Sequence, residues 1–471
     1  MVGKFRNSNS ISRKIIQLLG TNCNSPAHVY QIQAQLIIQN LYTNTTLASH
    51  FISACRSLGL SQTAFLLYTL NPQKPQTFIC NQLLRAFSHS DAHHYSISFY
   101  SHMHKNLIFP NNYTFPFILK SLSDLRSLKQ GKCIHAQIVK LGPLNDIYVQ
   151  NSLLNLYASC GDMVSSGYVF DEMPHKDVVT WTVVITGYRE CSMFKDALIA
   201  FEQMQNAGVE PNQVTMVNAL AACASFGALD MGVWIHEFIK RKGWTLDVIL
   251  GTALINMYGK CGRIEEGLKV FKSMEEENVF TWNALIKGFA LAENGQEAVM
   301  WFSEMEREGA NKPNEVTLIA VLCACVHSGL VKWGEEIFSS LLHQKYGFSP
   351  GVKHYACMID LLARDGRLED ALRIIDKLPF QSTKTIWGAF FSGCRVHGNL
   401  ELSEVAARKL VDLEPENCAY YVVLSNLYAE MGRWDDVEEI RRLMKNKEFR
   451  KDSGNSSIEL EYLEDVSKWL D

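Results

Sequence analysis

The sequence predicts an all-α, right-handed superhelical solenoid of helix-turn-helix repeats, and three observations lead to it. Residues 151–182 match residues 252–283 at many positions, at an offset of 101 residues. Residues 126–142 match residues 227–243 at the same offset. The apolar residues between these landmarks have the period of a helix, and no segment has the alternation of a strand. Because a two-helix unit cannot bury its own apolar face, stacked neighbours must share a core.

The offset divides into two repeats of 35 residues and one of 31 residues. With these lengths the chain divides into consecutive repeats, which are 77–111, 112–146, 147–177, 178–212, 213–247, 248–278, 279–314, 315–350 and 351–382. Upstream, 46–76 has the length of a short repeat and 11–45 that of a degraded long repeat. The register of the sequence alone does not establish these two. Two helices from each repeat give about twenty helices.

The repeat 178–212 illustrates why each unit should form two helices. Four apolar residues of its second half share one helical face: Ala197, Leu198, Phe201 and Met204. Gly208 follows them, as expected where a helix ends. In the short repeats, Gly161 and Gly262 should mark the turn between the two helices.

Length and composition exclude several classes of protein. A chain of 471 residues is too long for one compact core, and an apolar content of 47% with 20% charged residues indicates a folded chain. No apolar stretch approaches the roughly 20 residues that span a bilayer. The thirteen cysteines include no CxxC pair, which is typical of a reducing compartment and not of a disulfide scaffold.

The net charge of −4 is unevenly distributed along the chain. Residues 1–90 contain seven Lys or Arg and no Asp or Glu, so the remainder carries a net charge of −11. A nucleic-acid-binding protein with this balance needs a local basic strip together with base contacts. The first twenty residues are basic, contain serine and lack acids, which is typical of an organelle transit peptide. The alternative is a basic first helix that stays in the protein.

Several phrases of the sequence resemble one family. They are IHAQIVKLG, NLYASCG, VFDEMPHKDVVTWT and MYGKCG. Together with the alternation of long and short repeats, they resemble the plant pentatricopeptide repeat family, over about residues 77–460. Residues 383–460 resemble the extension motifs of members that specify cytidine-to-uridine editing sites. Two departures stand out: Ser457 replaces the family's usual Trp, and the sequence reaches Asp471 without the deaminase-like domain of some relatives.

The resemblance implies four segments. Residues 1–45 are expected to hold an organelle transit region and a degenerate repeat, and 46–382 the repeat array. Residues 383–460 are the extension motifs, which resemble degenerate repeats, and 461–471 a C-terminal tail.

The sequence gives no sign of catalytic chemistry. A zinc cytidine deaminase needs an HxE glutamate and a PCxxC pair, and neither motif occurs. The nearest cluster is Cys323, Cys325 and His327, but residues i and i+2 of a helix point apart and cannot share a metal. We therefore expect no enzyme, no metal and no cofactor, and a deaminase that a partner supplies in trans.

The resemblance assigns a role to the second residue of each repeat. In the family such residues sandwich each RNA base between adjacent repeats. Here they are Phe78, Tyr113, Tyr148, Val179, Val214, Ile249, Phe280, Val316 and Val352. The alternative is that these apolar side chains pack one repeat against the next.

The family reads one base per repeat with the fifth and last residues. The clear pairs are Asn81 with Asn111, Asn151 with Asp177, Thr182 with Asn212, Thr252 with Asn278, and Asn283 with Asn314. Two weaker pairs are Pro116 with Asp146 and Val217 with Asp247. The alternative is that the last residues only cap the next helix. Capping does not explain Asn or Thr at the fifth place, where both are mediocre helix formers.

The sequence therefore predicts a protein that binds single-stranded RNA in an organelle, with the mitochondrion favoured over the chloroplast. Its partners would be that RNA, a deaminase-bearing editing protein and other editing factors. The pairs predict a preferred core of 5′-Y-N-U-A-N-A-Y. Two alternatives stay open: a factor for splicing, stability or translation of organelle RNA, and a protein-binding helical solenoid.

Overall fold

The structure is a computed structural model that describes residues 15–19, 25–39, 41–69, 76–90 and 93–446. Within these residues the secondary structure consists of α-helices and one 3-10 turn, η1 (Pro143–Asn145), with no strand. The all-α prediction is therefore confirmed. The chain forms two compact parts, Met1–Ala222 and Cys223–Asp471, with the division inside helix α13.

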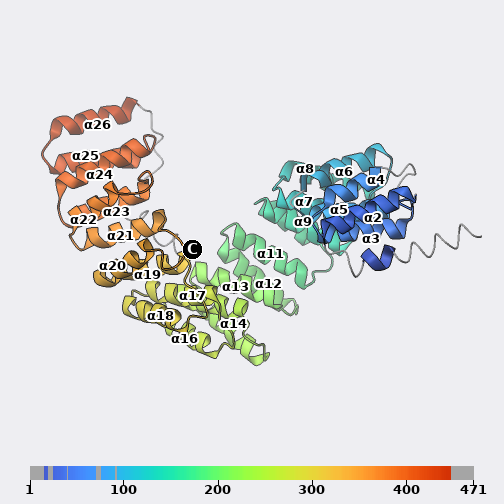
Figure 1. The fold of residues 1–471 in the computed structure, drawn as a ribbon, viewed down its shortest axis with the longest axis horizontal. Coiled ribbons are helices and arrows are strands. Elements are labelled where there is room, and N and C mark those ends of the chain that lie inside the picture. The colour runs from blue at the N-terminus through green and yellow to red at the C-terminus, as the bar shows by residue number, and fades with distance from the viewer. Residues whose placement is uncertain (1–14, 20–24, 40, 70–75, 91–92, 447–471) are drawn as a thin grey trace, which may run out of the picture. The chain divides into compact units, whose positions relative to one another are not determined.

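Figure 1 traces the helices of the two parts. The N-terminal part holds α2 (Pro26–Ile38), α3 (Thr45–Ser57), α4 (Ser61–Thr69), α5 (Thr77–Ser88), α6 (His93–Lys105), α7 (Phe115–Asp124), α8 (Leu128–Leu141), α9 (Ile147–Ser159), α10 (Met163–Glu172), α11 (Val178–Glu190), α12 (Phe194–Asn206) and most of α13 (Gln213–Phe226).

The C-terminal part continues the same pattern of helical hairpins. Its helices are α14 (Leu229–Arg241), α15 (Val248–Lys260), α16 (Ile264–Ser273), α17 (Val279–Leu291), α18 (Gly295–Glu308), α19 (Glu315–Ser328), α20 (Val331–Leu342), α21 (Val352–Arg364), α22 (Leu368–Asp376), α23 (Lys384–Val396), α24 (Leu400–Leu413), α25 (Cys418–Glu430) and α26 (Trp434–Asn446).

The repeats from 46–76 to 351–382 supply helices α3 to α22, two for each repeat as predicted. The total exceeds twenty because α2 precedes them and α23 to α26 follow them. Within each part, the first helix of a repeat packs on the first helix of the next, as α9 does on α11 and α15 on α17. The second helix packs against the first helix of its own repeat. None of the described helices is long and apolar enough to cross a bilayer.

The predicted helix ends are also present. Helix α12 buries Ala197, Leu198, Phe201 and Met204. Gly208 follows with a φ of +70°, and Gly161 and Gly262 turn the short repeats with φ values of +77° and +72°. These angles lie in the left-handed region that glycine adopts without steric cost.

Helix α7 starts three residues later than its repeat. Helices α9 and α11 begin at the first residue of their repeats, whereas α7 begins at Phe115, three residues after the start of 112–146. Pro116 lies in the first turn of α7. Because proline has no N–H to donate, it is tolerated only in that first turn. Tyr113 consequently lies just before the helix and not in it.

Glycine allows two neighbouring helices to approach closely. A Cβ built on Gly259 of α15 would lie 2.9 Å from the Cα of Gly288 in α17. The two backbones are thus in contact where repeats 248–278 and 279–314 meet. This close approach helps to fix the first helices of adjacent repeats, whose N-termini carry the predicted pairs.

Candidate nucleic-acid interface

In seven repeats the last residue accepts a hydrogen bond at the start of the next repeat. Its side-chain Oδ1 accepts a hydrogen bond from a backbone N–H two or three residues later. This holds for Asn111, Asp146, Asp177, Asn212, Asp247, Asn278 and Asn314. At Asn111 the N–H belongs to Tyr113, which precedes helix α7. At the other six residues these contacts satisfy N–H groups that a helix leaves unpaired, so capping explains part of their role.

Capping uses only one of the two polar atoms on these side chains. In Asn212, Asn278 and Asn314, every side-chain hydrogen bond made to the described residues ends on Oδ1. The Nδ2 group, which carries two donors, takes no part in them. A last residue can therefore close a helix and still offer a second polar group to a ligand.

Three of the five predicted pairs are in direct contact. The Nδ2 of Asn81 donates to Oδ1 of Asn111 at 3.0 Å, and that of Asn283 donates to Oδ1 of Asn314 at 3.2 Å. In the third pair, Asn151 Nδ2 lies 3.4 Å from Oδ1 of Asp177. The three fifth-place asparagines are buried or nearly so, although asparagine is a mediocre residue inside a helix.

A third residue, which the repeat pattern alone did not assign, completes each of the five networks. It is the threonine at the third place of the following repeat, fully buried in every case: Thr114, Thr180, Thr215, Thr281 and Thr317. In the two pairs whose fifth residue is threonine, this third-place threonine links the fifth residue to the last one. Thr215 Oγ1 lies 2.7 Å from Thr182 Oγ1 and 2.9 Å from Asn212 Oδ1.

Thr281 makes the equivalent link between Thr252 and Asn278, at 3.1 Å and 3.3 Å. The signal for these residues was present in the sequence, because threonine occurs at the same place after all five clear pairs. The structure is what connects the third place to the fifth and last places.

The weaker pairs lack this network. Val149 and Leu250 occupy the third place after them and offer no hydroxyl. At the first weak boundary, Oδ2 of Asp146 accepts a hydrogen bond from Asn112 Nδ2 at 2.9 Å, so its second oxygen is already engaged. The structure thus separates the clear pairs from this weak one by a physical criterion.

The second residues of the repeats are exposed. From Phe78 to Val316, their exposed fractions run from 48% for Val179 to 74% for Tyr148, while Val352 is half-buried. In the same helices, Trp181 and Trp282 are almost completely buried. Packing between repeats therefore does not account for the second residues, and their exposed apolar faces are available to a ligand.

Two of these exposed side chains share a helix face with a basic residue. Phe78 and Arg85 in α5, and likewise Phe280 and Lys287 in α17, are seven residues apart and share a helix face.

Partial burial pushes the pKa of Asp177 upward, but the hydrogen bonds that it accepts from Thr180 and Asn151 together hold it below its ordinary value. The carboxylate of Asp177 is therefore ionised and acceptor-only at neutral pH.

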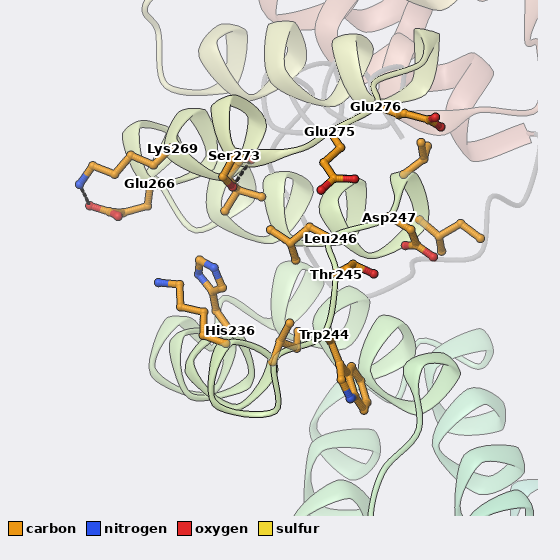
Figure 2. Close-up of a pocket in the computed structure, with 15 residues that line it drawn as sticks. His236, Trp244, Thr245, Leu246, Asp247, Glu266, Lys269, Ser273, Glu275 and Glu276 are labelled. Atoms are coloured by element: carbon orange, nitrogen blue, oxygen red, sulfur yellow. Dashed lines mark hydrogen bonds and ion pairs between the residues drawn. The ribbon is translucent and has the colours of Figure 1, made fainter.

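A cavity of about 920 Å³ lies beside Asp247, between α14, α16 and the loop that joins α14 to α15. Figure 2 shows Lys269 paired with Glu266 at one side, whereas Glu275 and Asp247 lie at the other. Lys240, which also lines the cavity, is paired with Glu237. Groups of both signs line the cavity, and its two lysines are already paired.

The histidine in this cavity belongs to a structural pair. His236 Nδ1 lies 2.8 Å from the hydroxyl of Tyr258, and burial lowers the pKa of the ring. His135 and Tyr157 form the same contact at 2.8 Å, 101 residues earlier. The pair therefore recurs with the repeat and contributes to packing.

The three residues of the cysteine cluster of α19 differ in their exposure. Cys323 and Cys325 are buried, whereas His327 is exposed. The Sγ of Cys323 lies 3.5 Å from Sγ of Cys357 in α21. That hydrogen bond and burial raise the pKa of Cys357, which keeps it a thiol. Among the described residues, no three His, Cys, Asp or Glu side chains are grouped to hold a metal ion.

Comparison with known proteins decides the family. A putative pentatricopeptide repeat-containing protein of Arabidopsis thaliana is 35% identical over 462 residues, which cover 96% of this chain and 92% of that protein. The chain belongs to the pentatricopeptide repeat family. The family models named PPR repeat and PPR repeat family match residues 151–178, 176–225, 252–279, 277–327 and 354–379.

The family model named E motif matches residues 397–459. This match agrees with the extension that the sequence suggested. A second pentatricopeptide repeat-containing protein of Arabidopsis thaliana is 38% identical, covering 93% of this chain and 76% of that protein. A third, named as mitochondrial, is 34% identical, covering 93% and 84%.

Solved structures share the fold of this pentatricopeptide repeat chain. The protein PPR10 in complex with an 18-nt psaJ RNA element has a TM-score of 0.71 at 15% identity, over 95% of this chain and 66% of that chain. PPR10 from maize has a TM-score of 0.58 at 15% identity, over 99% and 72%. The fold is therefore a solenoid of helical hairpins.

Proposed function

We propose that this chain binds one stretch of single-stranded organelle RNA and reads its bases with the fifth and last residues of successive repeats. The observation that carries the proposal is the polar network at each clear pair, flanked by an exposed apolar second residue. Bases stack on such apolar faces, and their edges are read by donors and acceptors. The structure of PPR10 in complex with RNA supports this role for the shared fold.

The chemistry of each pair matches a base. Asn151 retains an N–H donor and Asp177 is an acceptor, which together suit a carbonyl and the N3–H of uracil. The hydroxyl of Thr182 and the amide of Asn212 suit the amino group and ring nitrogen of adenine. Thr252 and Asn278 have the same side chains and therefore also suit adenine.

Two asparagines present donors to the acceptors of a pyrimidine, which assigns Y to Asn81/Asn111 and to Asn283/Asn314. With RNA 5′ at the N-terminal repeats, the preferred core is 5′-Y-N-U-A-N-A-Y.

The finer role within this proposal is to specify a cytidine-to-uridine editing site. The match to the E motif supports it. A deaminase would act in trans, because the sequence contains neither the HxE nor the CxxC motif. Residues 46–382 would read RNA, and 383–460 would serve the editing partners. Ser457 and the tail 461–471 lie outside the described residues.

The proposed location is an organelle, with the mitochondrion favoured. The relative that is named as mitochondrial supports this choice. Much of the transit region within 1–45, including residues 1–14, lies outside the described residues. A fluorescent reporter fused behind residues 1–60 should enter mitochondria, and a diffuse cytosolic signal would contradict the proposal.

The proposed function is tested in two steps. Purified chain is first mixed with tiled single-stranded organelle transcripts, and the bound tiles are sequenced. Those sites are then sequenced in a knockout plant, which should lose conversion of a cytidine a few nucleotides 3′ of the bound core. Unspliced or depleted transcripts with normal conversion would favour the splicing or stability alternative, and absence of any bound tile would refute RNA binding.

A further inference from the structure

We infer that the buried threonine at the third place of a repeat sets the base preference of the preceding repeat by orienting that repeat's fifth residue. The inference rests on the proposed RNA binding and deepens it. Three boundaries carry it, those where the fifth residue is asparagine. Their threonines are Thr114, Thr180 and Thr317.

The hydroxyl of each threonine has one proton and several neighbours. Thr317 Oγ1 lies 2.6 Å from Oδ1 of Asn283 and 3.0 Å from Oδ1 of Asn314. Its oxygen also accepts the backbone N–H of Asn314 at 3.0 Å. Because the contact with the fifth residue is the shorter one, the proton goes to Oδ1 of Asn283.

The other two boundaries are built in the same way. Thr114 Oγ1 lies 2.8 Å from Oδ1 of Asn81 and 3.0 Å from Oδ1 of Asn111. Thr180 Oγ1 lies 2.8 Å from Oδ1 of Asn151 and equally 2.8 Å from Oδ1 of Asp177, and it accepts the backbone N–H of Asp177 at 3.2 Å. Oδ1 of Asp177 already accepts the N–H of Thr180 and the Nδ2 of Asn151. Oδ1 of Asn151 has no other donor among the described residues, so we assign the hydroxyl proton to Asn151 here too.

This contact decides which end of the amide faces which neighbour. An asparagine amide has an acceptor end and a donor end, and the surrounding hydrogen bonds assign them. With the threonine proton on Oδ1, the Nδ2 of Asn151 must turn toward Oδ1 of Asp177. One N–H of Nδ2 makes that contact and the other remains for a base. The reverse orientation would place two oxygens against each other.

Removal of the hydroxyl would undo the assignment. Oδ1 of Asn151 lies on a side chain that is 9% exposed, and a buried acceptor without a donor is costly. The amide would then lose one of the two contacts that hold it in place, so the donor presented to the base would no longer be fixed. The preference for one base over another should fall, while contacts to the RNA backbone stay.

The chain itself shows that valine is compatible with the third place. Val149 occupies it in repeat 147–177 and is fully buried there. Thr180→Val keeps the shape of the side chain and removes only the hydroxyl. Thr180→Ser keeps the hydroxyl and serves as the matched rescue variant.

The experiment uses the full chain and four synthetic single-stranded RNAs. They carry the core 5′-C-A-U-A-A-A-C with U, C, A or G at its third position, which Asn151 and Asp177 are proposed to read. We expect unmodified protein to prefer U by roughly tenfold. With Thr180→Val this preference should fall to about threefold or less, and Thr180→Ser should retain it. The preference for A at the next position, read by Thr182 and Asn212, should not change in either variant.

Each outcome decides one statement. Full U preference in Thr180→Val would overturn the inference and leave the proposed function standing. Equal weakening of all four RNAs, or a lower melting temperature with unchanged preference, would show that Thr180 is only a packing residue. Absence of any base preference in the unmodified protein would refute the proposed base reading itself, and the inference with it.

Discussion

The side-chain amide of Asn283 donates to Oδ1 of Asn314 at 3.2 Å, across the boundary between two repeats. The same oxygen accepts the backbone N–H of Thr317 at 3.0 Å and so caps helix α19. One atom of Asn314 therefore serves the fold and holds the neighbouring repeat, while its Nδ2 is left for a ligand. Capping and base reading use different atoms of one residue, which makes the predictions below separable.

Asn212→Asp should change a base preference without loss of stability. Oδ1 of the new carboxylate can still accept the backbone N–H of Thr215, which Asn212 accepts at 2.9 Å. The two donors of Nδ2 are replaced by an acceptor, so the preference at that base should move from A toward G. Relative binding of the two RNAs should shift by about tenfold or more. If the substitution weakens all RNAs equally, or alters only the melting temperature, Asn212 is a cap and nothing more.

Tyr148→Ala and Phe280→Ala should weaken RNA binding and leave folding intact. Both side chains are mostly exposed, so their removal costs little stability. Each stacked base contributes roughly 1–3 kcal/mol to binding. Trp282→Ala is the opposite control, because that buried side chain should cost about 3–5 kcal/mol of unfolding free energy. A large loss of stability in Phe280→Ala would instead favour the alternative that these side chains pack one repeat against the next.

Gly259→Ala should destabilise the C-terminal part. Its new Cβ would meet the backbone of Gly288 at 2.9 Å, and overpacking of this kind costs about 1–3 kcal/mol. Gly167→Ala is the matched control, because a Cβ there meets nothing within 4 Å in the described structure. That change should be neutral or stabilise by about 0.5–1 kcal/mol. Chemical denaturation of the two variants measures the difference, and equal effects would contradict the close approach of α15 and α17.

Acidification should destabilise the chain through His354. Its Nδ1 accepts the N–H of Gly351 at 3.0 Å, and its Nε2 lies 3.2 Å from the carbonyl of Glu315. Burial lowers the pKa of His354 in the folded state, so the unfolded chain takes up the proton first. The free energy of unfolding should therefore fall as the pH drops below about 6.5.

The matched variant is His354→Gln, which can make both hydrogen bonds but does not titrate. Between about pH 7.5 and pH 5.5, the unmodified protein should lose more unfolding free energy than this variant, by at most about 1.4 kcal/mol for a group whose pKa is near 6.5 in the unfolded chain. A slope that is the same in both proteins would assign the pH dependence to other groups.

Much of this architecture is encoded locally and could be predicted. The turn glycines Gly161 and Gly262 follow from the left-handed conformation, and the ends of helices follow from residues such as Asp177. The start of α7 could not be placed from repeat length, because Pro116 imposes a later first turn. Thr180 was missed because its partners are 29 and 3 residues away, and only the stacking of repeats brings them together.

The most direct test of the account is selection of RNA from a random single-stranded library by the purified chain, followed by sequencing. We expect the unmodified protein to enrich 5′-Y-N-U-A-N-A-Y. Asn212→Asp should change only the first A of that core, toward G. Enrichment of no sequence, or of a sequence that Asn212→Asp leaves unchanged, would contradict base reading by the fifth and last residues.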